Sequence, residues 1–256
     1  MRLSDKVIVV TGSTSGIGRA IAERCVREGA QVLLHGLAPE EGVDVSKALG
    51  VRARFHADDL VDPASATRLV AAALAAFGRI DAVVNNAAAI VRSNLRTTTP
   101  EFFDRVMAVN VRAPLLLIQA AFPELKKNRG CVLNIGSMNA LSGESELLDY
   151  SISKGALQTL SRNLANAHGE DGVRFNHFNL GWVLSPNEYA LQRRLGQPED
   201  WPQRVPKTYA PSGKLIVPEE IATAAVYWLG DESRPITGSV VDLEQYSLYG
   251  RNPLKS

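Results

Sequence analysis

The stretch Thr11-Gly12-Ser13-Thr14-Ser15-Gly16-Ile17-Gly18 indicates the fold class, because it joins an apolar run over 6–11 to a helical pattern over 16–28. Such a sequence is typical of a β-strand, a tight turn and an α-helix. We assign Gly12 to the tight turn, Gly16 to close approach of a ligand phosphate, and Gly18 to close packing of helix on strand. The N–H groups at the helix start favour an anion. The turn therefore predicts a site for a dinucleotide pyrophosphate, and a turn without ligand is the alternative.

Beyond this turn, short apolar runs alternate with helical periodicity, which is typical of βαβ units in a parallel sheet. Continuous apolar strands indicate that helices cover both faces of the sheet. The expected strands are 6–11, 31–36, 51–56, 82–85, 132–135, 174–179 and 239–243, and the expected helices are 16–28, 63–77, 100–127, 149–168 and 218–229. The sequence thus predicts one α/β domain over 1–256 with a doubly wound, seven-stranded parallel sheet.

Composition limits the partners. The 256 residues carry 28 Lys and Arg against 27 Asp and Glu, a net charge of +1 that provides no strong field for nucleic acid or an anionic membrane. No apolar run approaches the length of a membrane span, and the start lacks the apolar core of a signal peptide. Two cysteines and four histidines show no metal-ligand spacing. We therefore expect a cytoplasmic protein with no catalytic metal, no nucleic-acid partner and no membrane association.

Several segments together resemble the short-chain dehydrogenase/reductase family over nearly the whole chain. They are Gly-x-x-x-Gly-x-Gly at 12–18, Asn85-Asn86-Ala87-Ala88, Tyr150-Ser151-Ile152-Ser153-Lys154 and Leu180-Gly181-Trp182-Val183-Leu184-Ser185. Ala88 stands where the family has glycine, Leu180 where it has proline, and Ser185 where it has threonine. The resemblance implies a Rossmann-type fold and hydride transfer between a nicotinamide cofactor and a secondary alcohol or ketone.

The resemblance also implies four catalytic residues, Asn110, Ser137, Tyr150 and Lys154. Tyr150 would transfer the proton, Ser137 would stabilise the substrate oxygen, Lys154 would lower the tyrosine pKa and bind the ribose, and Asn110 would support a proton relay. Tyr150 and Lys154 share one helical face at this spacing, and acid/base work by a phenol near pH 7 needs its pKa lowered by about three units.

Pro114 adds a local prediction. It lies four residues after Asn110 and has no N–H, so the carbonyl group of Asn110 loses its ordinary helical donor. We therefore expect a kink over 110–114 that frees this carbonyl, within a helix opened by Thr99 and Pro100.

The expected cofactor contacts follow the same matches. They are Gly12, Ser13, Ser15, Gly16, Ile17, Gly18, Gly36, Leu37, Asp59, Leu60, Asn86, Ala87, Ala88, Tyr150, Lys154, Gly181, Val183 and Ser185. Asp59 matches the acidic residue that reaches the adenine. Gly36 and Leu37, at the end of the second strand, are neither acidic nor basic, so a 2′-phosphate would be poorly neutralised. We expect NAD as the preferred cofactor, with NADP as the alternative.

Substrate recognition is assigned to the parts that depart from the βαβ rhythm. Residues 186–218 hold six of the 13 prolines and predict a lid, and 243–256 predict a tail near the pocket or a subunit interface. The candidate substrate contacts are Asn139, Glu144, Trp182, Arg193 and Trp201. Polar neighbours favour a small sugar, polyol or hydroxy acid.

Two alternatives remain open. The enzymatic one is an NADPH-dependent 3-oxoacyl reductase, and the non-enzymatic one is a nucleotide-binding sensor. The resemblance also implies a homotetramer or a dimer, for which the helix over 149–168 offers apolar residues.

Overall fold

Seven parallel strands form one sheet in this computed structural model, which describes residues 1–246. The strands are β1 (Val7–Val10), β2 (Gln31–Gly36), β3 (Ala53–Ala57), β4 (Ala82–Asn85), β5 (Cys131–Ile135), β6 (Arg174–Leu180) and β7 (Val240–Leu243). Their order is β3-β2-β1-β4-β5-β6-β7, and every neighbouring pair is parallel. The predicted doubly wound sheet is therefore confirmed. The part of the predicted tail over 247–256 lies outside the described residues.

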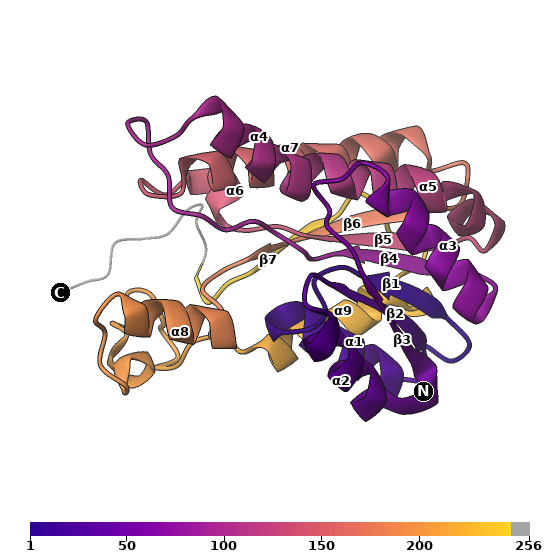
Figure 1. Ribbon diagram of the computed structural model, residues 1–256, viewed down its shortest axis with the longest axis horizontal. Coiled ribbons are helices and arrows are strands. Elements are labelled where there is room, and N and C mark those ends of the chain that lie inside the picture. The colour runs from indigo at the N-terminus through magenta and orange to yellow at the C-terminus, as the bar shows by residue number, and fades with distance from the viewer. Residues whose placement is uncertain (247–256) are drawn as a thin grey trace.

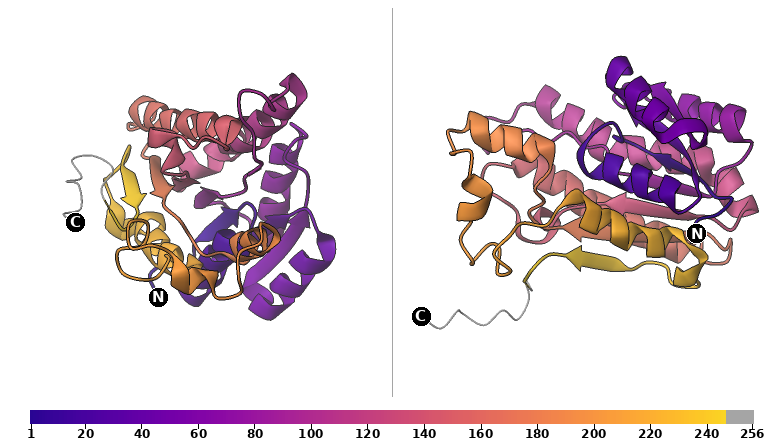
Figure 2. Two further views of the ribbon diagram at one scale, coloured as in Figure 1. Left: turned by 90° about the vertical axis from the view of Figure 1, so that its left-hand side faces the viewer. Right: turned by 90° about the horizontal axis from the view of Figure 1, so that it is seen from below.

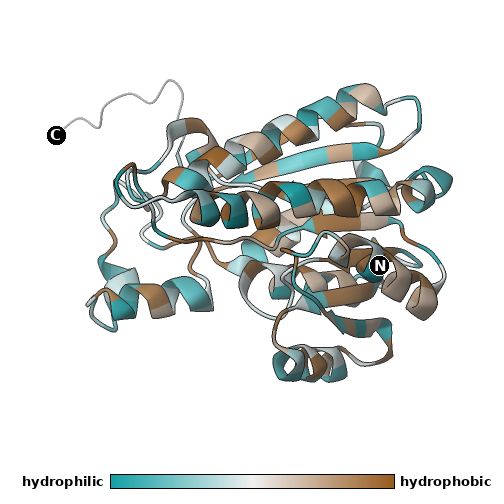
Figure 3. Cartoon of the chain, turned by 45° about the horizontal axis from the view of Figure 1, so that its top comes forward, coloured by the Kyte–Doolittle hydropathy of each residue, from teal (hydrophilic) through white to brown (hydrophobic). Residues whose placement is uncertain are grey.

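Helices cover both faces of the sheet (Figures 1 and 2). One face carries α1 (Gly16–Arg27), α2 (Pro39–Leu49) and α9 (Pro218–Leu229), and the other carries α3 (Ser65–Phe77), α4 (Pro100–Met107), α5 (Ala113–Lys127) and α7 (Leu148–Ala167). Hydrophobic and hydrophilic residues alternate along these helices (Figure 3), so each can bury one side against the sheet. The two resulting cores explain why β1, β4 and β5 are buried throughout.

Several elements differ from the sequence prediction. The third strand begins at Ala53, because a short 3₁₀ helix, Gly50–Arg52, occupies the expected start. Helix α2 had no predicted range, although the pair Glu40-Glu41 is typical of the first turn of a helix, where the structure places it. The one-turn helix α6 (Asn139–Ser142) and the lid helix α8 (Pro186–Arg194) had no predicted range either.

The long helix predicted over 100–127 is divided by a π-helical segment, Ala108–Arg112, between α4 and α5. There the N–H of Ala113 donates to the carbonyl oxygen of Ala108, five residues earlier. The predicted interruption of the ordinary i+4 pattern near Asn110 is confirmed. The whole stretch Pro100–Lys127 is long and apolar enough to cross a membrane by length and composition, a test that core helices also pass. Leu117, Ile118 and Leu125 of α5 are buried in a core of the domain.

The predicted lid is a small folded module at the carboxyl ends of the strands (Figure 1). Its base is closed by a bridge between Val183 and Ile216, and the Leu184 N–H donates to the Ile216 carbonyl oxygen at 2.8 Å. Trp201 centres an apolar cluster inside the module. The insertion therefore has its own core, in addition to the helix α8 that the proline content had concealed.

Candidate active site

The glycine turn between β1 and α1 has the geometry that its sequence predicts. Gly12 has a φ of +63° and Gly16 a φ of +54°, conformations that favour glycine. A Cβ atom at Gly18 would lie 2.2 Å from the carbonyl oxygen of Gly12, so the helix can approach the strand only with glycine there. Within 1–246 the Ser15 side chain makes no cap hydrogen bond, and the first turn of α1 holds no acidic residue. The helix start can therefore accept a pyrophosphate.

Two neighbouring segments hold this turn in place. The Asn86 side chain donates to the carbonyl oxygens of Thr11 and Gly12, each at 3.0 Å, and the Thr11 hydroxyl accepts from the N–H groups of Asn86 and Ala87. Ser13 is fully buried, and its hydroxyl donates to the carbonyl oxygen of Val10. Asn86 and Ser13, both predicted as cofactor contacts, thus also fix the turn, whose position at the β1–β4 junction is where the strand order reverses.

The adenosine end of the site is formed by the ends of β2 and β3. Gly36 is buried against the Thr14 side chain, whereas Leu37 is 66% exposed. Asp59 is exposed and its carboxylate accepts from the Val61 N–H at 2.9 Å, while Leu60 is buried. The neighbouring cation, Arg68, is paired with Asp58 and Asp62 at 2.6 and 2.8 Å. The residues predicted to contact the adenosine therefore lie together at the carboxyl ends of β2 and β3.

Ser137, Tyr150 and Lys154 lie together near the carboxyl end of β5. Ser137 follows β5, and its hydroxyl is hydrogen-bonded to the Tyr150 phenol on α7. The Lys154 ammonium, one helical turn later, lies 5.5 Å from the centre of the Tyr150 ring and donates to the Ile135 carbonyl oxygen at 2.7 Å. Tyr150 and Lys154 are both buried. The arrangement places a phenol and a hydroxyl where both can meet one substrate oxygen.

Burial dominates the titration of this pair. Burial raises the pKa of Tyr150 to about 12. The hydrogen bond with Ser137 acts in the opposite direction, and the charge of Glu144 adds a smaller increase. Burial also lowers the pKa of Lys154 to about 8. Both shifts favour the neutral groups. The predicted lowering of the Tyr150 pKa by Lys154 therefore remains a prediction, which requires the added positive charge of an oxidised nicotinamide.

Asn110 lies in the π-helical segment and is buried. Its side-chain amide donates to the Ala89 carbonyl oxygen at 3.1 Å and to the Ser153 hydroxyl at 2.9 Å, and its oxygen accepts from the Ala89 N–H at 2.7 Å. Asn110 thus joins the segment after β4 to the helix that carries Tyr150. Its side chain acts as a clamp, and its role in a proton relay remains a prediction.

The segment after β6 meets the glycine turn. A Cβ atom at Gly16 would lie 3.6 Å from the Ser185 Cβ, so the base of the lid borders the pyrophosphate position. The Ser185 hydroxyl accepts from the Glu188 N–H at 3.1 Å and caps α8, which leaves its own hydrogen free to donate. A Cβ atom at Gly181 would lie 2.0 Å from a Glu244 carboxylate oxygen. Glu244 of the tail therefore packs on the segment expected to hold the carboxamide.

The five candidate substrate residues fall into two groups. Asn139 and Glu144 lie together beside Ser137, with the Asn139 amide donating to the Glu144 carboxylate at 3.2 Å. Trp182 and Trp201 stack at 5.7 Å in the core of the lid, and Trp201 is only 3% exposed. Arg193 is exposed and donates to the Gln197 carbonyl oxygen. Substrate contact by these residues remains a prediction, and for Trp201 and Arg193 the lid contacts supply a structural role.

Two histidines act behind the site, and the motifs did not point to either. His35 accepts from the Gly12 N–H through Nδ1 at 3.2 Å, while its Nε2 lies 3.1 Å from the Asp58 carbonyl oxygen. A Cβ atom at Gly136 would lie 2.0 Å from Nε2 of His177, so this buried ring backs the residue before Ser137. Burial lowers the pKa of His177 to about 3. In the sequence, His35 is a polar residue after the apolar run of β2, whereas His177 is one of several polar residues in β6 and gave no separate signal.

No group of three or more His, Cys, Asp or Glu within residues 1–246 could hold a metal ion. A hollow of about 680 Å³ lies in the lid and is lined by Leu184, Tyr189, Glu199, Asp200, Pro202 and Gln203. None of the residues predicted as catalytic lines it.

Comparison with known proteins agrees with this geometry. Residues 12–244 match a family described as enoyl-(acyl carrier protein) reductase. The chain is 34% identical to L-fucose dehydrogenase of Mus musculus, over 93% of this chain and 86% of that protein. It is 31% identical to D-beta-hydroxybutyrate dehydrogenase of Rhizobium meliloti, over 93% of this chain and 97% of that protein. L-sorbose reductase of Gluconobacter frateurii, solved with NADPH and L-sorbose, superposes with a TM-score of 0.92 at 28% identity, covering 97% of this chain and 99% of that one.

Proposed function

This chain belongs to the short-chain dehydrogenase/reductase family, and on that premise we propose that it oxidises or reduces a small polar substrate at a secondary alcohol or ketone. The substrate class is a sugar, a polyol or a hydroxy acid. The observation that carries the proposal is the convergence of Ser137, Tyr150 and Lys154 beside an uncapped helix start and its glycine turn.

Each residue has a role that follows from its position. The glycine turn and the start of α1 would hold the pyrophosphate, and Ser185 would donate to the carboxamide. Bound there, the cofactor supplies a hydride acceptor or donor at C4 of its nicotinamide. Tyr150 gives or takes the proton of the substrate oxygen, and Ser137 stabilises that oxygen. Lys154 reaches the ribose and favours the phenolate, while Asn110 holds the helix that carries them.

We propose NAD as the preferred cofactor. The end of β2 supplies no charge at Gly36 or Leu37, and Arg68 is already engaged by two carboxylates. A 2′-phosphate would lack a free cation among these residues, whereas a ribose hydroxyl needs only hydrogen bonds. The sorbose reductase relative was solved with NADPH, so NADP is the competing candidate.

Assembly and compartment are proposals as well. Leu115 of α5 and Ile152 of α7 are 41% and 46% exposed, which supports packing of a second copy on these helices. Cys25 and Cys131 are both buried free thiols, which supports a reducing cytoplasmic compartment.

Exchange of Tyr150 for phenylalanine tests the function. The variant should bind NAD like the wild type but lose turnover by at least about 100-fold, because it removes only the transferable proton. Turnover is followed by nicotinamide absorbance with NAD and NADP over sugars, polyols, hydroxy acids and a 3-oxoacyl thioester, and Tyr227→Phe on α9 is the matched control. Retained activity in Tyr150→Phe would refute the proposal. Preference for the thioester with NADPH favours the 3-oxoacyl reductase, and cofactor binding without turnover of any class favours the sensor.

A further inference from the structure

A row of polar groups leads away from the reacting position. Ser137, hydrogen-bonded to Tyr150, accepts from the Asn139 N–H at 3.2 Å through its hydroxyl oxygen. The Asn139 side-chain amide then donates to a Glu144 carboxylate oxygen at 3.2 Å. Asn139 opens the one-turn helix α6, and Glu144 follows it on the exposed loop before α7. The row therefore runs from the buried phenol to the surface over which a substrate must enter.

The free atoms of this row are hydrogen-bond acceptors. Among contacts within residues 1–246, the Asn139 side-chain oxygen and the second Glu144 carboxylate oxygen accept no hydrogen bond. An ionised carboxylate accepts only, so its natural complement is a hydroxyl that donates. A substrate with hydroxyl groups one or two carbons from the reacting carbon supplies such donors. A substrate with a carboxylate at that position supplies further acceptors and a second negative charge.

The charges around the site point the same way. After burial and the Ser137 hydrogen bond, Glu144 is the charged group that acts on Tyr150, and it raises the pKa of the phenol. Lys154 is buried behind the tyrosine and donates to Ile135. Arg193 donates to a carbonyl oxygen at the exposed end of α8. Recognition of a hydroxy acid requires a cation facing its carboxylate, and the described residues place a carboxylate beside the phenol instead.

We propose that the Asn139–Glu144 pair selects uncharged polyhydroxylated substrates, sugars and polyols, and disfavours hydroxy acids. This inference rests on the proposed function and narrows its substrate class. It distinguishes the two kinds of relative, because one is named for a sugar and another for a hydroxy acid. Asn139 and Glu144 act on the neighbouring substituent, whereas Tyr150 and Ser137 act on the reacting oxygen.

A matched pair of compounds tests the selection. 1,3-Butanediol and 3-hydroxybutyrate share the secondary alcohol and differ in a hydroxymethyl group against a carboxylate. With saturating cofactor, wild-type kcat/KM should favour the diol by at least about fivefold, the scale of an exposed charge interaction. Glu144→Gln should lower the ratio of the two kcat/KM values by about the same factor, because its kcat/KM for 3-hydroxybutyrate rises. In the wild type the ratio should shrink with added salt, and in Glu144→Gln it should not change.

Glu146 provides the control, because it is an exposed carboxylate of the same loop that binds Asn94. Glu146→Gln should leave the ratio unchanged. Binding of both compounds to the cofactor-loaded protein, measured by calorimetry, gives a second readout that does not need turnover. If the wild type binds the diol more tightly than hydroxybutyrate but turns over neither compound, the proposed function is refuted and the selection by Glu144 is retained. A wild-type preference for hydroxybutyrate, or a ratio unaltered in Glu144→Gln, would overturn the selection by charge.

Discussion

His35 shows how one buried side chain can hold a cofactor site that it does not face. Its Nδ1 accepts from Gly12 and its Nε2 lies against the Asp58 carbonyl oxygen, so a neutral ring protonated at Nε2 satisfies both groups. Burial is the main cause that lowers the pKa of His35, and the charge of His56 lowers it further. The hydrogen bond to Asp58 and the charges of Asp58 and Asp59 raise this pKa. Protonation of Nδ1 would place two donors face to face.

Cofactor affinity should therefore depend on His35 and on pH. The pKa of His35 is lowered in the folded protein, so the ring is neutral at pH 7, and affinity should fall once the pH drops below this lowered pKa. His35→Leu should weaken NAD binding about tenfold at pH 7, the cost of an unpaired buried N–H. His35→Asn keeps an acceptor that cannot be protonated, and should bind with less pH dependence.

Titration of NAD binding by protein fluorescence between pH 5 and 8 measures this effect. His56→Asn is the control, because His56 contacts Asp58 but not the glycine turn. Wild-type affinity in His35→Leu would show that Gly12 needs no such support.

At the scale of elements, the π-helical segment is the device that aims Asn110. Pro114 cannot donate to the Asn110 carbonyl oxygen, and the backbone adopts i+5 spacing just before it. Alanine at position 114 would restore that donor and favour continuous α-helix. Asn110 would then rotate away from Ala89 and Ser153.

Pro114→Ala should thus keep or raise the thermal midpoint while lowering kcat/KM by about tenfold or more, because the catalytic helix loses its clamp. Pro123→Ala is the matched control, since Pro123 is also in α5 but lies inside the helix, away from the π-helical segment. It should raise stability with unchanged kcat/KM. Calorimetry and steady-state kinetics on both variants decide the matter, and equal activity in the two would contradict the clamp.

The sequence predicted the elements that announce themselves locally. Strands such as β1 are wholly apolar, and Pro114 located the interruption of the helix that the structure shows as a π-helical segment. The extent of helix α2 was not predicted, because its contact with the sheet is made partly by Gly42, over which the Phe55 ring packs: a Cβ atom at Gly42 would lie 2.1 Å from that ring. A glycine contributes nothing to apolar periodicity, so the pattern of this helix is hidden.

The same limit applies to the site. Motif spacing located Tyr150, Lys154 and the glycine turn, because each motif is a short continuous stretch of the sequence. The pairings of His35 with Gly12 and of Glu244 with Gly181 join segments far apart in the chain. Only the fold brings such partners together, so no local pattern could have predicted them.

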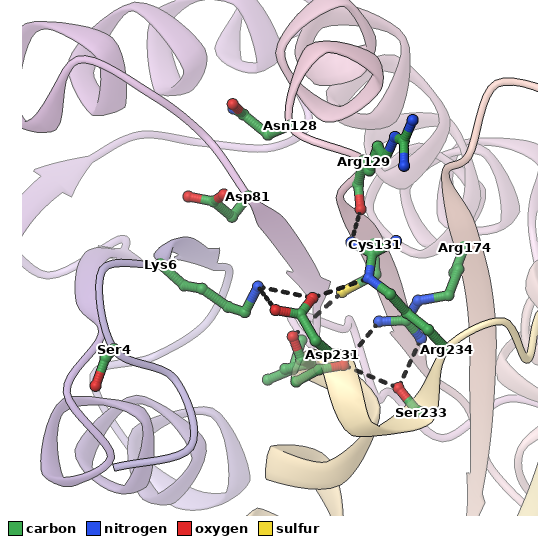
Figure 4. Close-up of polar contacts among 12 residues, drawn as sticks. Ser4, Lys6, Asp81, Asn128, Arg129, Cys131, Arg174, Asp231, Ser233 and Arg234 are labelled. Atoms are coloured by element: carbon green, nitrogen blue, oxygen red, sulfur yellow. Dashed lines mark hydrogen bonds and ion pairs between the residues drawn. The ribbon is translucent and has the colours of Figure 1, made fainter.

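In the whole molecule, a buried arginine and its partners lie at the opposite end of the sheet from the proposed active site. The proposed chemistry lies at the carboxyl ends of the strands. At the amino end, Arg174 at the start of β6 is buried and donates to the Ser233 hydroxyl and to the carbonyl oxygens of Trp228 and Gly230 (Figure 4). Asp231 beside it pairs with Lys6 and Arg234. This cluster joins α9, the first strand and the sixth.

Arg174→Met should therefore lower the free energy of unfolding by about 3 kcal/mol, because it removes the hydrogen bonds that the buried guanidinium donates to the Ser233 hydroxyl and to two carbonyl oxygens. The kcat/KM of the protein that remains folded should be unchanged, since Arg174 lies at the amino end of the strands and Tyr150 near their carboxyl end. Urea unfolding followed by fluorescence measures the first quantity, and Arg105→Met on exposed α4 is the control. If Arg174→Met lowered kcat/KM without lowering the free energy of unfolding, the two ends of the sheet would instead be energetically coupled.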